Sequence, residues 1–282
     1  MRSELKTAFR LLTFRAASDE VRALSGRHLM LGLLFTWLVG MGRWWEDPRA
    51  NWLQHLGIGS VVYVFILSFF LWLVLWPLAP GSWSLINVLA FVSLTSPPAI
   101  LYALPVRHGL ELHWAQTVRL WMLAVVAGWR VALLIFYLQR SGFSGGRIIV
   151  ASLFPLILIV FTLTVLNLEK VVFNIMDGIH KEDATVNDSA YVVLFFISAG
   201  SVLLFLPLLA SYLIIAVRTV LFKVGRKAGY VVYGIALGCG IAGVVLGFYG
   251  QAFFATVMVA SGGVMAITAM GEVHKEKKGD VG

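Results

Sequence analysis

The chain has 282 residues, of which 60% are hydrophobic and only 13% are charged, and its mean hydropathy is +0.88. A soluble domain is about half apolar and about a quarter charged, so this composition excludes an ordinary soluble protein and predicts an all-α integral membrane protein. The net charge of +8 is attributed to cations gathered on one side of the membrane, not to nucleic-acid binding. The single cysteine, Cys239, excludes an internal disulfide and a CxxC motif.

Residues 1–28 precede the first apolar run and are basic. The spacing predicts an amphipathic helix that lies in the inner headgroup region. Its apolar face would carry Leu5, Ala8, Phe9 and Leu12. The alternative is a frayed helix that supplies only a basic topology signal. A cleavable signal peptide is not expected, because the basic stretch is too long and no small-residue cleavage site follows the first apolar run.

Apolar runs of transmembrane length follow one another along the rest of the chain. Each is near the roughly 20 residues that a helix needs to cross the hydrocarbon. The sixth is long and contains Pro207, which predicts a tilt or a kink. A charged tail at 272–282 ends the chain. We therefore expect a domain of about eight transmembrane helices over 29–271. Whether the last hairpin spans the membrane fully stays open. The runs are 29–45, 56–78, 84–105, 118–138, 148–168, 190–217, 229–249 and 252–271.

The distribution of lysine and arginine predicts the orientation. With the N-terminus in the cytoplasm, the inner segments carry 15 Lys and Arg residues and the outer loops carry 6. This bias agrees with an even number of spans and predicts that both termini are cytoplasmic. Tryptophans flank the predicted turns, as is typical of membrane interfaces. The compact loops favour a bacterial cytoplasmic (inner) membrane.

Arg130 lies inside the fourth apolar run, where a lone cation costs about 2.5–3.5 kcal/mol or more. The preceding run contains Pro97 and Pro98, which lack N–H groups, so the carbonyls of Ser93 and Leu94 lose their helical partners. Counted from the inner ends of the two runs, Arg130 and Ser93 differ in depth by only about 3 Å. Free carbonyls need donors and arginine supplies five, which predicts contact between Arg130 and the broken helix.

Two interpretations of this intramembrane polar site stay open. In the first, Arg130 is a structural latch that satisfies the segment from Ser93 to Pro98, with help from Thr95 and Ser96. In the second, the same geometry binds an anion, such as a lipid phosphate or a carboxylate.

Two further groups are weaker candidates. His108, Glu111 and His113 contain zinc-binding residue types, but on a helix the two histidines do not converge, so no metal site is expected. The last two runs are rich in small residues, which predicts close helix packing in a terminal hairpin or at a dimer face. These residues are Gly234, Gly238, Gly243, Gly247, Gly262 and Ala266.

All 14 acidic residues and all six histidines lie outside the predicted spans, which disfavours a proton- or sodium-coupled carrier. The expected function is a non-enzymatic membrane component: a scaffold or assembly subunit, or an uncoupled permease for a non-ionic or lipid-like substrate. The alternative is an intramembrane enzyme that acts on a lipid or lipid-linked phosphate. Arg130 would hold the phosphate, and His108, Glu111 and His113 would supply acid–base chemistry. No cofactor is expected. The expected partners are the lipid bilayer, with anionic lipid at Arg130, and a membrane protein or a second copy of this chain, but no nucleic acid.

Overall fold

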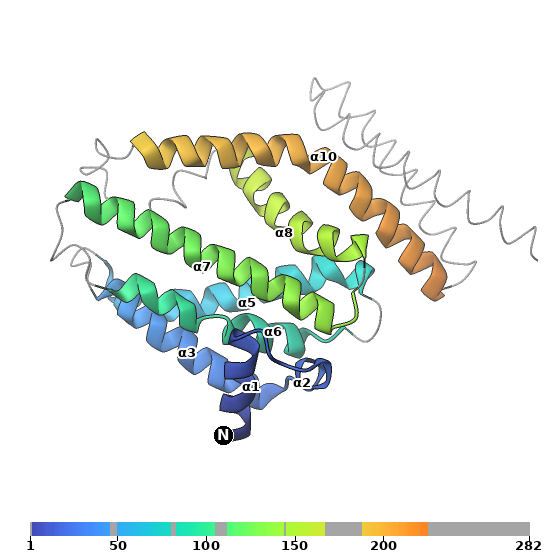
Figure 1. Ribbon diagram of the computed structural model, residues 1–282, viewed down its shortest axis with the longest axis horizontal. Helices are drawn as coiled ribbons and strands as arrows, with labels where there is room; N and C mark the ends of the chain where they lie inside the picture. Colours follow the sequence, from blue (N-terminus) through green and yellow to red (C-terminus); the bar gives the residue numbers. More distant parts are fainter. Residues whose placement is uncertain are drawn as a thin grey trace, which may run out of the picture.

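The computed structural model describes residues 2–45, 50–79, 83–104, 112–143, 145–166 and 188–224. These ranges form helices joined by turns, with no strand among them (Figure 1). In chain order the helices are α1 (Arg2–Leu12), α2 (Ser18–Arg22), α3 (Gly26–Trp44), α4 (Trp52–His55), α5 (Ile58–Leu75), η1 (Trp76–Leu78), α6 (Leu85–Leu94), η2 (Pro97–Ala103), α7 (Leu112–Arg140), α8 (Gly146–Val165) and α10 (Asp188–Val224).

Five helical segments are long and apolar enough to cross a membrane. They coincide with the second to the sixth predicted runs, which confirms the all-helical class and fits an integral membrane protein. The sixth run is one continuous helix, α10, which contains Pro207 and changes direction near its middle (Figure 1). The five segments are Ile58–Leu78, Leu85–Ala103, Thr117–Arg140, Gly146–Val165 and Val192–Thr219.

The first predicted run, 29–45, is helical in α3 but is not one of these five segments. The physical reason is its polar ends, because α3 carries Arg27 and His28 in its first turn and Arg43 in its last turn. The runs at 229–249 and 252–271 lie outside the described residues. The count of eight spans therefore stays a prediction.

The turn between α3 and α5 depends on Gly57. This residue precedes α5 in a left-handed conformation with φ of 69°, which glycine adopts without steric cost. A β-carbon at Gly57 would also lie 2.7 Å from the carbonyl oxygen of Trp37 in α3. The indole N–H of Trp37 donates in turn to the carbonyl of Leu56 at 2.8 Å. The two helices consequently meet closely at this turn.

The helices α3, α5 and α6 pack together, and α10 packs along α8 (Figure 1). Stacked aromatic rings join several of these elements. Phe91 of α6 stacks on Tyr137 of α7 with centroids 4.0 Å apart, and Phe161 of α8 stacks on Phe205 of α10 at 3.9 Å. These contacts hold α7 and α10 to the more deeply buried helices.

The N-terminal helices α1 and α2 lie beside α3, α6 and α7 (Figure 1). The bundle buries Ala8 and Leu11 of α1, whereas Leu5 and Phe9 are 41% and 64% exposed. The predicted apolar face is thus divided, because Ala8 packs inward and Leu12 is partly buried against the core, while Leu5 and Phe9 stay exposed. Placement of this helix at a membrane interface stays a prediction.

Candidate functional site

The candidate span Leu85–Ala103 is interrupted between α6 and η2. Helix α6 ends at Leu94, and η2 begins at Pro97. Proline disfavours helical geometry in the residue before it, so a run of consecutive prolines ends a regular helix. The chain continues through the gap with shorter-range bonds, in which the N–H of Ser96 donates to the carbonyl of Ser93 at 3.2 Å and the N–H of Ala99 to the carbonyl of Ser96 at 2.9 Å.

Thr36 of α3 faces this interruption and joins it to the neighbouring helix. Its hydroxyl oxygen lies 2.6 Å from the hydroxyl oxygen of Ser96 and 2.9 Å from the carbonyl oxygen of Gly32. A hydroxyl has one hydrogen to donate. If Thr36 donates to the carbonyl of Gly32, then Ser96 donates to Thr36, and both groups are satisfied. Thr36 also lies 3.4 Å from the carbonyl oxygen of Ser93.

The hydroxyls around the interruption are almost completely buried. Ser93 is 0% exposed, and Thr36, Thr95 and Ser96 are all below one tenth. Ser93 donates to the carbonyl of Ala90 at 2.9 Å, and Thr95 donates to that of Val92 at 2.7 Å. Buried polar groups are costly unless bonded, and each of these hydroxyls has its partner within the protein.

Arg130 of α7 reaches the same place. Its Nε–H donates to the carbonyl of Thr95 over 3.4 Å. The expected acceptors were the carbonyls of Ser93 and Leu94. The contact falls on Thr95 instead, and Ser93 retains a backbone partner because the short-range bond from Ser96 replaces the lost helical bond. Arg130 and the interruption are therefore adjacent, whereas the latch and the anion site both stay hypotheses.

The bond to Thr95 uses one of the five N–H donors of the guanidinium, and it is long for a strong hydrogen bond. Within the described ranges, no carboxylate lies at ion-pair distance from Arg130, which is partly exposed. The two terminal nitrogens are thus available for an acceptor that belongs to another molecule.

Close approach of the backbones brings α3 to α6. A β-carbon at Gly32 would lie 2.2 Å from the hydroxyl oxygen of Ser93 and 2.9 Å from the backbone nitrogen of Leu94. Gly40, two turns along α3, meets Ser60 of α5 in the same way, since its β-carbon would lie 2.7 Å from that hydroxyl oxygen. Small residues at intervals of four are the signal for such packing, and Gly32, Thr36 and Gly40 carry it in the sequence.

A second polar contact, at Asn87 near the start of α6, was not predicted. Its amide nitrogen donates to the carbonyls of Val21 and Arg22, at 3.0 and 3.1 Å. Its amide oxygen accepts from the hydroxyl of Tyr137 at 2.6 Å. Asn87 therefore ties α2, α6 and α7 together, and only its position inside an apolar run could have singled it out.

The remaining candidates fall outside the described part of the chain. This holds for His108, Glu111 and the side chain of His113, and for the small residues of the terminal hairpin from Gly234 to Ala266. Among the residues that the structure describes, no three His, Cys, Asp or Glu side chains lie close enough together to hold a metal ion.

Comparison with known protein families, with curated protein sequences and with solved structures finds no match. The function is therefore inferred from the geometry of the chain itself.

Proposed function

We propose that this protein is a non-enzymatic component of a bacterial cytoplasmic membrane. It acts as a scaffold or assembly subunit, or as an uncoupled permease for a non-ionic or lipid-like substrate. One observation carries the proposal: the polar groups around the interruption of α6 are directed at one another and at backbone carbonyls. A catalytic cavity would instead present several polar groups toward a shared substrate position.

In this proposal the chain crosses the membrane eight times, with the run 29–45 as the first span and both termini in the cytoplasm. The support is the cation bias, with 15 Lys and Arg residues in the inner segments against 6 in the outer loops. Reporter fusions after Gly282 and within residues 181–188 should report opposite sides of the membrane. The same side for both fusions would contradict the proposed number of spans.

Native mass spectrometry of the gently extracted protein tests the functional proposal. A scaffold should retain a protein partner or a second copy of this chain in fixed proportion, and a permease should retain a neutral lipid or small molecule. Conversion of a lipid-linked phosphate by the purified protein would contradict the proposal, provided that a substitution at Arg130 or in the interruption of α6 abolishes the conversion.

The second candidate function is an intramembrane site for a lipid or lipid-linked phosphate. The observation that favours it is the pair of terminal guanidinium nitrogens of Arg130, for which no partner lies among the described residues. A planar guanidinium binds phosphate through two parallel hydrogen bonds. If this candidate holds, Arg130→Leu should fold and lose a co-purifying anionic lipid, whereas Arg140→Leu, at the end of the same helix, should retain it.

A further inference from the structure

The segment that joins α1 to α2 lies against α7, which relates its position to the depth of the bilayer. The ring of Phe14 lies 5.7 Å from that of Phe136 and 6.1 Å from that of Trp129, between ring centroids. At 1.5 Å per residue, Phe136 is about 6 Å and Trp129 about 16 Å along α7 from its end at Arg140. Since the candidate span Thr117–Arg140 ends at this arginine, Phe14 lies beside the membrane-spanning part of α7 and not beyond it.

The chain then returns toward the end of the bundle. The carbonyls of Val21 and Arg22 accept from the side chain of Asn87, which is in the first turn of α6 and thus at the beginning of the candidate span Leu85–Ala103. The hydroxyl of Tyr137, three residues before Arg140, bonds to the same side chain. Residues 14–22 consequently lead from the side of the span back to its end.

The turn that places Phe14 is strained and locally braced. Phe14 has a φ of 58°, in the left-handed region that bulky residues rarely adopt. The hydroxyl of Thr13 donates to the carbonyl of Phe9 at 2.8 Å, and the N–H of Arg15 donates to that of Arg10 at 2.7 Å. Such strain persists where the surroundings impose it, and here the surroundings are two aromatic rings of α7.

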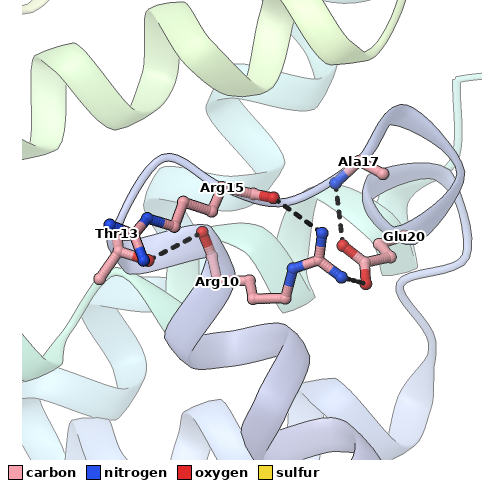
Figure 2. Close-up of polar contacts among 5 residues, drawn as sticks. All are labelled: Arg10, Thr13, Arg15, Ala17 and Glu20. Carbon is pink, nitrogen blue, oxygen red and sulfur yellow. Dashed lines mark hydrogen bonds and ion pairs between the residues drawn. The ribbon is translucent and has the colours of Figure 1, made fainter.

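An ion pair closes the loop between α1 and α2 (Figure 2). Arg10 contacts the carboxylate of Glu20 at 2.6 Å and donates to the carbonyl of Arg15 at 3.1 Å. The second carboxylate oxygen of Glu20 accepts from the N–H of Ala17 at 2.8 Å. Charges placed near hydrocarbon need such partners, so this cluster is suited to a segment that leaves water.

The outward side of the same segment combines apolar and basic residues. Leu5, Phe9 and Phe14 are exposed, and they continue the exposed apolar surface of α7 through Trp129. Lys6 and Arg15 are exposed beside them. Residues 1–28 carry six Lys and Arg against three acidic residues, which matches an anionic lipid surface better than a cationic or neutral one.

We propose that residues 2–24 form a re-entrant anchor, which enters the anionic leaflet at the Arg140 end of α7 and leaves it on the same side. Leu5, Phe9 and Phe14 lie among the acyl chains, while Lys6 and Arg15 extend to the lipid phosphates. This inference rests on the proposed placement of the protein in a membrane. It goes further in assigning the N-terminal segment a depth, a leaflet and a lipid class.

Spin-label accessibility tests the depth of this anchor. In a Cys239→Ala background, nitroxides are attached in turn to Phe9→Cys, Ile66→Cys and Asp19→Cys, in the full-length protein in vesicles of phosphatidylcholine and phosphatidylglycerol. Ile66 is exposed on the spanning helix α5 and Asp19 is exposed on α2, so they calibrate lipid and water. We expect the label at position 9 to collide with oxygen severalfold more than with a water-soluble nickel chelate, as the label at position 66 does.

The other outcomes separate a failure of the anchor from a failure of the membrane placement. If position 9 resembles position 19 while position 66 is shielded from the nickel chelate, the anchor is wrong and the membrane placement stands. If position 66 is also open to the chelate, the membrane placement itself fails, and the anchor with it. Leu5→Cys gives the same comparison if the variant at Phe9 does not fold.

The lipid class is tested by the phosphatidylglycerol that the protein retains in native mass spectrometry. The double variant Lys6→Gln and Arg15→Gln should reduce the ratio of retained phosphatidylglycerol to phosphatidylcholine severalfold. The charge-conserving control, Lys6→Arg with Arg15→Lys, should keep the wild-type ratio. An unchanged ratio in the neutral variant would overturn the assignment of lipid phosphates to these two side chains.

Discussion

The contact between α3 and α6 and the contact between α8 and α10 join helices by different means. At the first, Gly32 lets the backbones approach until buried hydroxyls of one helix reach the other. At the second, the side chains of Phe161 and Phe205 stack between helices at 3.9 Å. Of the most apolar stretch of Leu85–Ala103, 56% is buried, against 11% for Val192–Thr219, so α10 is the more exposed helix. Phe161 and Phe205 are nevertheless only 7% exposed each, so their stacked rings lie in the core.

The difference follows from what drives association in lipid. Acyl chains are as apolar as leucine, so apolar burial alone gains little there, and packing and hydrogen bonds must hold helices together. A close backbone contact leaves no room for substitution. Stacked rings leave the backbones farther apart, so neighbouring side chains can shift into part of the space that a lost ring vacates. We therefore expect the contact between α3 and α6 to tolerate change less.

The largest effect should come from filling the space at Gly32. In Gly32→Val the new β-carbon would meet the hydroxyl oxygen of Ser93 and the backbone nitrogen of Leu94, and a backbone atom cannot move aside cheaply. We expect a loss of stability of about 3 kcal/mol, measured as a lowered midpoint of unfolding in detergent. Gly200→Val on α10 is the matched control, because no atom lies within 4 Å of its β-carbon position. Equal losses in both variants would show that the close approach does not limit stability.

The next effect should come from Arg130, which touches the interruption of the core helix. Arg130→Leu removes the donor to the carbonyl of Thr95, and we expect a loss of about 1–3 kcal/mol because a buried carbonyl loses a partner. Arg130→Lys should also be less stable than wild type, since one ammonium cannot reproduce the planar fork. Thermal unfolding in detergent measures both.

A double-mutant cycle sharpens this prediction. Replacing Pro97 and Pro98 by alanine should let α6 continue, and so should partly restore the stability of Arg130→Gln. Strict additivity of the changes would mean that Arg130 does not act through the interrupted helix, and the latch would be abandoned.

A smaller effect is expected at the contact between α8 and α10. Phe161→Ala removes one of two stacked rings, and the measured loss of thermal stability should correspond to about 1 kcal/mol, since the stacking is lost while apolar burial alone contributes little in lipid. Phe195→Ala, on the exposed side of α10, is the control and should change the midpoint little. A loss at Phe161 larger than that at Gly32 would reverse the ranking of the two contacts.

The sequence predicts the region around the interruption of α6 only in part. The prolines at 97 and 98 make an end of helix near Leu94 expected, and simple depth counting brings Arg130 to the same level. The choice of Thr95 as acceptor depends on one local turn, which depth counting cannot resolve. Similarly, the spacing of Gly32 and Gly40 is present in the sequence, but such spacing does not say which helix is the partner.

Asn87 and the N-terminal segment show the same limit at longer range. Nothing in the neighbourhood of Asn87 indicates that its partners lie 66 residues earlier, at Val21, and 50 residues later, at Tyr137. The periodicity of residues 2–12 predicts a helix with an apolar face, but not that Ala8 and Leu11 pack inward while Phe9 stays exposed. Tertiary contact decides these placements, and local pattern does not.

The smallest expected effect is a pH dependence of stability at the start of α3. It comes from His28, and neither α8 nor α10 contains a histidine. The N–H of Ser25 donates to Nδ1 of His28 at 3.3 Å, so this nitrogen must be unprotonated. Burial lowers the pKa of His28 below its usual value of 6.5, and the nearby carboxylate of Glu4 opposes this only in part. As the pH falls below about 6.5, the unfolded chain takes up a proton more readily than the folded one. The stability that the neutral ring contributes is therefore complete above this pH and is lost as the pH falls through the lower folded-state pKa.

Thermal unfolding at pH 7.5, 6.5 and 5.5 should show a small decline in the unfolding midpoint of the wild type. His28→Gln keeps an acceptor for Ser25 but cannot titrate, so its midpoint should decline less over the same range. An equal decline in both proteins would place the acid sensitivity elsewhere in the chain.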